Sequence, residues 1–277
     1  MTRTILLDHR QPPQHRRADR WPAAKAIAYT LDISLRFLAD VAVGRGSIDS
    51  AERLIAGYWP RVLRAGNARL SVVGREHFPS GQPCVVMSNH ASLLDIPALM
   101  GAVPGPVRMV TKQELTRVPI WGQALVASGF IALDRKDRGK AIAQLEKAKT
   151  ILRQGVHVWI APEGTRTRTG VLGPFKKGGF HVALALGVPI VPAWIEGTRD
   201  VVAPDSFVVR YDGDVEVRFG PPIATAGLGR DELEGLMEQV RLAMVALASG
   251  PTGTTPATTT PATTTPATAT TTAPTTA

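Results

Sequence analysis

The chain has 277 residues, and its 44% hydrophobic content is enough to form one full domain with extensions. Its 32 Lys and Arg residues against 23 Asp and Glu residues give a formal net charge of +9, which suits a nucleic acid, an anionic membrane surface or a phosphorylated substrate. We expect no nucleic-acid partner, because the sequence has no zinc-ligand spacing, no aromatic RNA-binding signature and no recognition helix dense in Lys and Arg.

The N-terminal stretch, residues 1–21, mixes arginines with prolines and has no apolar core of signal-peptide length, so we predict a mobile basic arm. Residues 23–43 follow with the spacing of an apolar helix, and their charged side chains fall in one stripe: Lys25, Asp32, Arg36 and Asp40. Each such charge would cost roughly 2.5–3.5 kcal/mol near the centre of a bilayer, which favours an amphipathic helix over a transmembrane one. The pattern fits a helix in a membrane interface and a helix packed on the rest of the chain equally well.

A second helix is predicted over residues 48–65, and the two helices form a hairpin within residues 22–67. From Leu70 onward, short apolar strands alternate with helical stretches, which predicts an α/β domain over residues 68–249 with a mixed, largely parallel sheet flanked by helices. The expected strands are 69–74, 83–88, 107–110, 129–134, 156–161 and 189–195, followed by an antiparallel pair, 207–211 and 214–219, around Asp212-Gly213. The expected helices are 92–101, 119–127, 139–153, 178–187 and 230–248.

The C-terminal stretch, residues 250–277, consists almost entirely of Thr, Pro and Ala and carries no charge. Such a segment has almost nothing to bury, so we predict a disordered tail with polyproline II character.

A candidate site lies at Ser88-Asn89-His90-Ala91-Ser92-Leu93-Leu94-Asp95, directly after an apolar run that includes the single Cys84. We interpret Cys84 as a small core residue. A His with a carboxylate partner suits general base catalysis, because the carboxylate fixes the tautomer in which the other ring nitrogen can take a proton. The alternative is that Asn89 or Ser92 caps the following helix and that His90 is a polar loop residue.

A second strand end carries Glu163-Gly164-Thr165-Arg166. Arg offers forked donors and a permanent charge that suit a phosphate, and Gly164 lets the backbone approach a ligand closely. The alternative is a solvated basic loop.

These residues resemble the glycerolipid acyltransferases, the family that includes bacterial 1-acylglycerol-3-phosphate acyltransferase. Asn89 to Asp95 resembles the family's NHxSxxD signature, and the resemblance extends over roughly residues 68–222. Three further blocks follow in the family's order: Gly129-Phe130-Ile131-Ala132-Leu133-Asp134-Arg135, Glu163-Gly164-Thr165-Arg166 and Val188-Pro189-Ile190-Val191-Pro192. Two positions depart from the family's pattern, Ala132 and Thr167, and neither removes a charge.

The resemblance implies transfer of an acyl group from acyl carrier protein or coenzyme A to the free hydroxyl of 1-acylglycerol-3-phosphate, which gives phosphatidic acid. His90 would be the base and Asp95 its partner, while Lys112 would stabilise an oxyanion unless it is a surface lysine. The residues that the resemblance links to the acceptor are Arg135, Glu163, Gly164, Thr165 and Arg166. The last block, residues 188–192, would form an acyl-chain wall or a core strand.

Neither a metal nor another cofactor is expected, because one His and one Asp do not make a ligand set. The resemblance implies a peripheral or monotopic protein at the cytoplasmic face of the cell membrane. Three alternatives remain: another lysolipid acceptor such as lyso-ornithine lipid, a serine hydrolase that uses Ser88 or Ser92, and a non-catalytic lipid-binding protein. The sequence lacks the GxSxG motif that a serine hydrolase site would show.

Overall fold

The computed structural model describes residues 17–133 and 138–250, so the predicted tail and most of the predicted basic arm lie outside the described residues. Seven of its described strands form one sheet. Five of these strands run parallel to one another, and β2 and β9, which are parallel to each other, run antiparallel to those five. This is the mixed, largely parallel sheet that the sequence predicts. In spatial order the strands are β2 (Arg69–Val73), β9 (Asp214–Phe219), β7 (Ile190–Glu196), β3 (Val85–Ser88), β6 (His157–Ile160), β4 (Val107–Lys112) and β5 (Ile131–Leu133).

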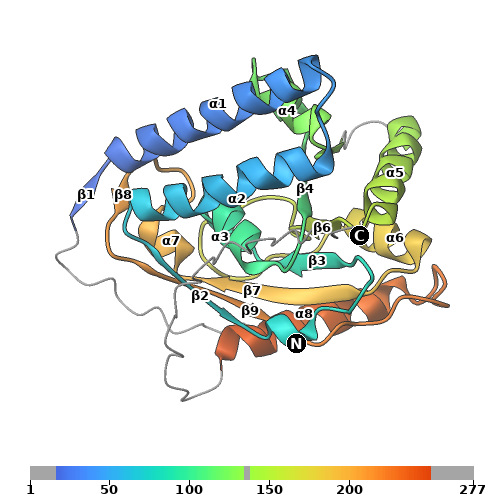
Figure 1. Cartoon of the computed structure of the whole chain (residues 1–277). Coiled ribbons are helices and arrows are strands. Elements are labelled where there is room, and N and C mark those ends of the chain that lie inside the picture. Colours follow the sequence, from blue (N-terminus) through green and yellow to red (C-terminus); the bar gives the residue numbers. More distant parts are fainter. Residues whose placement is uncertain (1–16, 134–137, 251–277) are drawn as a thin grey trace, which may run out of the picture.

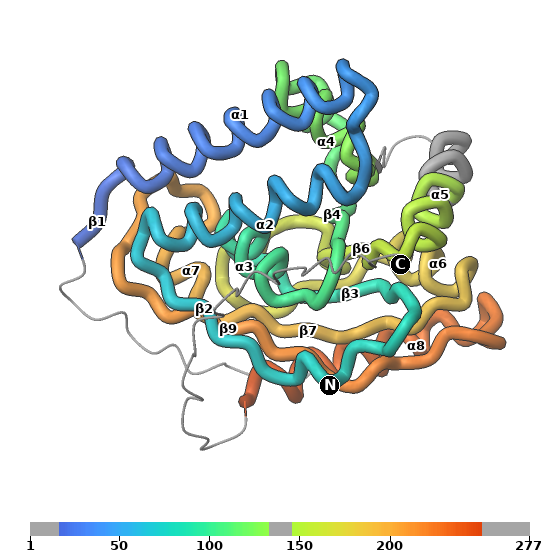
Figure 2. Tube along the Cα trace, viewed as in Figure 1, coloured from blue at the N-terminus to red at the C-terminus, as the bar shows by residue number. Residues whose placement is uncertain are grey.

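Helices cover both faces of the sheet, as Figures 1 and 2 show, with the α1–α2 hairpin on one side and α8 on the other. The α-helices are α1 (Trp21–Ala42), α2 (Ile48–Ala65), α3 (Asp95–Ala102), α4 (Trp121–Ala127), α5 (Arg138–Arg153), α6 (Gly178–Leu186), α7 (Thr198–Val201) and α8 (Leu233–Ser249). Two 3-10 helices are η1 (Arg75–His77) and η2 (Gln113–Arg117). The predicted hairpin is therefore present, and α2 begins where Ser47 and Ser50 cap each other's backbone N–H groups.

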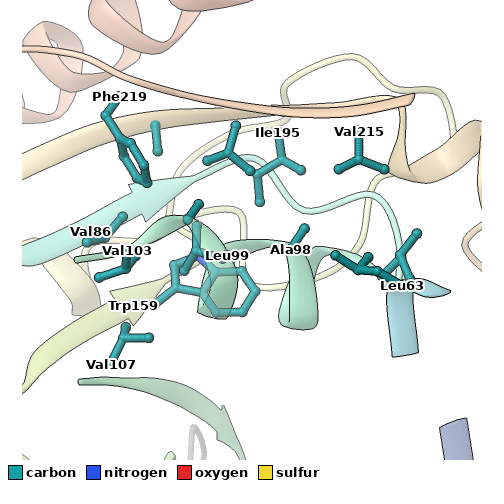
Figure 3. Packing of buried hydrophobic residues seen from close by; sticks show 14 of the residues in the cluster. Leu63, Val86, Ala98, Leu99, Val103, Val107, Trp159, Ile195, Val215 and Phe219 are labelled. Atoms are coloured by element: carbon teal, nitrogen blue, oxygen red, sulfur yellow. The ribbon is translucent and has the colours of Figure 1, made fainter. Parts of the chain in front are cut away.

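The apolar run before His90 is buried on both sides because it forms a central parallel strand. Val86 of β3 faces a cluster shared with α2 and α3, in which Leu99 and Trp159 pack side by side with Phe219 nearby (Figure 3). Its neighbours Val85 and Met87 face the opposite cluster, shared with α5, α6 and α8. The two cores hold β3 rigidly, and the loop that follows it is the candidate site.

Cys84 is a core residue, as predicted: it is fully buried, and burial raises the pKa of its thiol to about 12. Its backbone N–H donates to His157 Nδ1 over 3.2 Å, and His157 Nε2 lies 3.2 Å from the carbonyl oxygen of Pro104. Burial lowers the pKa of His157, which fits a neutral imidazole that donates from one ring nitrogen and accepts at the other.

The predicted antiparallel pair at 207–211 and 214–219 is wrong. The strand β8 (Val209–Arg210) pairs with β1 (Ala18–Asp19), a part of the predicted arm. Instead β9 lies between β2 and β7, where Val215, Val217 and Phe219 are buried. A strand inserted between two partners has no edge left for β8, and this long-range pairing outweighs the local turn signal of Asp212-Gly213.

A buried ion pair fastens the hairpin to the sheet. The guanidinium of Arg108, on β4, is fully buried and donates to Glu52 of α2 and to the carbonyl oxygens of Ser128 and Val107. Its Nη2 has no hydrogen-bond partner within the described residues. Removing Glu52 would therefore leave a buried charge without its counter-ion.

We expect Glu52→Ala to lower the free energy of unfolding by about 3 kcal/mol, or roughly 6–12 °C in Tm, because the Arg108 charge stays buried. The double variant Glu52→Ala/Arg108→Met should recover much of this loss. As a control, Glu234→Ala breaks the exposed Lys177–Glu234 pair and should cost under about 1 kcal/mol. Urea and thermal denaturation measure all three, and equal losses in Glu52→Ala and Glu234→Ala would contradict the anchoring role.

Candidate active site

His90 and Asp95 form a close pair in the loop between β3 and α3. His90 Nδ1 lies 2.7 Å from Asp95 Oδ2. The Asp95 side chain is 1% exposed and that of His90 is 18% exposed, so the imidazole alone reaches the surface. The indole of Trp159, on β6, stands edge-on to the imidazole at 5.8 Å between ring centroids. The loop lies at the carboxyl end of a parallel strand, where open α/β sheets place their ligands.

The carboxylate of Asp95 accepts hydrogen bonds at both oxygens. Besides His90, the backbone N–H groups of Ala91 and Ser92 donate to Oδ2 over 2.8 and 2.9 Å. The hydroxyl of Thr198, at the start of α7, donates to Oδ1. These donors fix the orientation of the carboxylate, and a carboxylate bonded to Nδ1–H leaves His90 Nε2 free to accept a proton.

The capping alternative does not hold for Asn89, because its side chain pairs with β7 instead. Asn89 Nδ2 donates to the carbonyl oxygen of Ile195 over 2.8 Å, and the Ile195 N–H donates back to Oδ1 over 2.7 Å. Ser92 accepts from the Leu94 N–H and donates to the Val202 carbonyl oxygen, so it ties the loop to the end of α7. The helix begins at Asp95, three residues later than predicted, because the residues before it turn back onto the carboxylate.

The Glu163 to Arg166 segment lies beside His90. The Thr167 N–H donates to the His90 carbonyl oxygen over 2.8 Å, which joins the two loops. Gly164 has a φ of 76°, a left-handed conformation that favours glycine. Gly164, Thr165 and Arg166 line the same cavity as His90, and Arg166 Nη1 donates to the carbonyl oxygen of Pro204 at its edge.

Glu163 is not among the residues that line this cavity. Its side chain is 6% exposed, and Oε2 accepts from the Gly173 N–H over 2.8 Å while Oε1 has no partner among the described residues. Burial raises the pKa of Glu163, against the opposing effects of the Gly173 N–H, the nearby His90 and the charge of Arg241. Glu163 therefore closes the 163–173 loop from inside and does not face a ligand.

A cavity of about 1160 Å³ opens at His90 and runs beneath the helical hairpin. Side chains from α1, α2, α3 and α4, most of them apolar, form much of its wall, among them Phe37, Tyr58, Met100 and Leu125. Basic residues line it as well: Lys112, Arg166, Arg168 and Lys176. One cavity thus joins a base, positive charge and a long apolar space.

Not every predicted site residue reaches this cavity. Arg135 lies outside the described residues. The block at 188–192 supplies Ile190 and Val191 to the two cores and does not line the cavity, so the core-strand interpretation fits it better than an acyl-chain wall. Within the described residues, no three His, Cys, Asp or Glu side chains gather in a way that could hold a metal ion.

A protein-family model described as Acyltransferase matches residues 69–196. Similar curated proteins include 1-acyl-sn-glycerol-3-phosphate acyltransferase alpha from Mus musculus, 39% identical over 180 residues, and from Homo sapiens, 40% identical over 181 residues. Over these residues the chain is similar to the acyltransferase family. The two alignments cover 65% of this chain and 63% of each relative, so the match spans less than two thirds of those proteins.

The fold of this chain also resembles a solved structure. The crystal structure of the 1-acyl-sn-glycerophosphate acyltransferase PlsC from Thermotoga maritima matches with a TM-score of 0.62 over 81% of this chain and 97% of that one. The two sequences are 23% identical, so this likeness concerns the fold.

Sequence reasoning missed one residue of this candidate site, Thr198, whose hydroxyl donates to the Asp95 oxygen that His90 does not contact. A signal for it was present, because Glu196-Gly197-Thr198-Arg199 repeats the tetrapeptide at 163–166.

Proposed function

We propose that this acyltransferase moves a fatty acyl group from an acyl carrier protein or coenzyme A thioester to the free hydroxyl of 1-acylglycerol-3-phosphate, giving phosphatidic acid. The observation that carries the proposal is the shared cavity. Its volume is about 1160 Å³, and its wall contains His90 together with several basic side chains. The names of the relatives from Mus musculus, Homo sapiens and Saccharomyces cerevisiae, all 1-acyl-sn-glycerol-3-phosphate acyltransferases, support this acceptor.

In the proposed reaction, His90 Nε2 takes the proton from the acceptor hydroxyl. The oxygen attacks the thioester carbonyl carbon, the carbon–sulfur bond breaks, and the leaving thiolate receives the proton from the imidazolium. Asp95 keeps Nδ1 protonated and stabilises the imidazolium. Lys112, which is exposed at the end of β4 and lines the cavity, stabilises the negative charge on the carbonyl oxygen in this proposal.

The acceptor phosphate binds in this proposal at Arg166 and the backbone of Gly164 and Thr165. Glu163 supports this loop without contacting the phosphate, since its carboxylate is turned toward Gly173. The hairpin side of the cavity holds an acyl chain.

A serine nucleophile is disfavoured by the surroundings of both candidate serines. Ser88 and Ser92 are fully buried. Ser88 Oγ donates to the Asn89 carbonyl oxygen and accepts from the Trp159 indole N–H, and Ser92 Oγ donates to the Val202 carbonyl oxygen. Within the described residues, neither hydroxyl forms a hydrogen bond with the His90 imidazole, so neither serine has a base to activate it.

His90→Ala should lower the rate of acyl transfer by roughly 10²–10⁴-fold, because general base catalysis supplies a factor of this size. Circular dichroism and Tm should match the unaltered chain, since the His90 ring lies at the mouth of the cavity. The assay follows phosphatidic acid formed from lysophosphatidate and acyl coenzyme A or acyl carrier protein. Activity above about a tenth of the original would remove His90 from the role of base.

Arg166→Ala should raise the KM for lysophosphatidate roughly ten- to hundred-fold, because a lost charge-assisted hydrogen bond costs about 1.5–3 kcal/mol. The KM for the thioester should change little. Arg153→Ala, which removes the same charge at the end of α5, is the matched control and should leave both constants unchanged. The KM for a lyso-ornithine acceptor, which has no phosphate, should not change in Arg166→Ala. Equal effects on acceptor and donor would assign Arg166 a structural or donor role.

We further propose that α1 binds a membrane surface, on the cytoplasmic side where thioester donors are made. Large apolar side chains of α1 remain exposed beside the cavity mouth: Trp21, Ile27, Leu31 and Leu35. The residues of the predicted charged stripe have partners of their own: Arg36 pairs with Asp32, Arg45 pairs with Asp40, and Lys25 lies over the Trp21 ring. None of the described helices combines the length and apolar character that crossing a bilayer requires.

The double variant Ile27→Ser/Leu35→Ser should weaken binding to anionic vesicles roughly 30-fold, because two half-exposed side chains would forfeit about 2 kcal/mol of burial. Leu242→Ser, at an equally exposed leucine on α8, is the control and should bind normally. Sedimentation with phosphatidylglycerol-containing vesicles measures both. Binding should also weaken with salt. If the control lost as much binding as the α1 variant, the docking surface would have to be reassigned.

A further inference from the structure

The tetrapeptide Glu-Gly-Thr-Arg occurs twice in the chain, and the glycine of each copy has a left-handed backbone conformation. Each follows a parallel strand, at 163–166 after β6 and at 196–199 at the end of β7. Gly164 and Gly197 have φ values of 76° and 80°. Only glycine fits at position 197, because the Cβ of any other residue would lie 1.9 Å from the Asp214 carbonyl oxygen. The second turn is therefore held rigidly against β9.

The two copies place their side chains differently. Glu163 is buried inside its loop, whereas Glu196 is exposed and accepts from the Trp194 indole N–H over 2.8 Å. Arg166 lines the cavity, whereas Arg199 does not. The second copy is therefore not a second phosphate site.

Thr198 reaches the oxygen of Asp95 that the catalytic loop leaves open. Oδ2 takes its hydrogen bonds from His90, Ala91 and Ser92, and Oδ1 takes one from Thr198 Oγ1. Thr198 is 2% exposed and Asp95 is 1% exposed, so water does not substitute for this bond. A donor at Oδ1 fixes the rotation of the carboxylate, and with it the direction of the hydrogen bond between Oδ2 and His90.

Arg199 stabilises the loop that carries Arg166. Its guanidinium donates through Nη2 to the Arg168 carbonyl oxygen over 2.9 Å and through Nη1 to the Thr169 carbonyl oxygen over 3.1 Å. These two carbonyls belong to the loop that begins at Glu163 and carries Arg166. Neighbouring residues of one short segment thus contact both the Asp95 carboxylate and the acceptor loop.

We propose that Glu196-Gly197-Thr198-Arg199 is the positioning segment of the site, in which Thr198 orients the His90–Asp95 pair and Arg199 holds the acceptor loop. This inference rests on the proposed acyl transfer for its kinetic consequences, but the orientation of Asp95 can be observed without turnover. The segment acts on the rate through Thr198 and on acceptor affinity through Arg199.

Thr198→Val and Thr198→Ser form the matched pair for the first half, since valine keeps the shape and serine keeps the hydroxyl. Thr198→Val should lower kcat roughly 10- to 100-fold, the size expected for one hydrogen bond to a charged group, and leave the KM for lysophosphatidate unchanged. Thr198→Ser should stay within about threefold of the unaltered chain, since it retains the donor. Arg199→Gln should show the opposite split, with a raised KM for lysophosphatidate and little change in kcat.

The structural readout is the His90 Nδ1–H proton in NMR spectra of the full chain, assigned by its absence in His90→Ala. This proton should be protected from exchange in the unaltered chain and in Thr198→Ser, and should exchange faster in Thr198→Val. Thr198→Ala replaces the valine variant should that one fail to fold. The chain could acylate no lysolipid while Thr198→Val still sped up exchange of the His90 Nδ1–H proton. In that case the proposed function would fail and the positioning role would stand. An unchanged kcat and an unchanged proton in Thr198→Val, or equal losses in the Val and Ser variants, would overturn the positioning role.

Discussion

The carboxylate of Asp95 is stable in the interior only because both of its oxygens receive hydrogen bonds, since an ionised carboxylate without them would cost several kcal/mol. Three of these bonds come from the loop after β3, and the fourth comes from Thr198 after β7. The strands β3 and β7 are parallel neighbours, so their pairing places the donors around one point. The orientation of His90 follows from that of Asp95, and the position of the base is thereby set by the centre of the sheet.

The hairpin gives this base a substrate-sized space. Its α1 has one side turned toward the cavity, where Thr30 and Phe37 line the wall, and another where Leu35 remains exposed. A Tyr58–Thr30 hydrogen bond joins the two helices, and the Arg108–Glu52 pair ties α2 to the sheet. A lipid that leaves a membrane beside α1 would therefore have a short apolar path to His90, which is why the proposed reaction and the proposed membrane docking depend on the same helix.

The sequence predicts the local features of this site well and the long-range ones poorly. The five-residue spacing of His90 and Asp95 and the central strands are local patterns, and the structure agrees with them. The pairing of β8 with β1 and the bond from Thr198 to Asp95 join residues far apart in the chain. The spacing of apolar residues along the sequence does not predict such contacts. The direction of Glu163 was equally hidden, because a motif names a residue type without saying whether it faces a ligand or its own loop.

The central claim is that His90 activates the acceptor for direct attack on the thioester, and initial-rate kinetics of the full-length chain test it most directly. Lysophosphatidate and the acyl thioester are varied together, and phosphatidic acid is measured. Direct attack requires both substrates to be bound before transfer, so double-reciprocal lines should intersect. Parallel lines, with an acyl group trapped on the protein, would mean a covalent intermediate and would contradict the account.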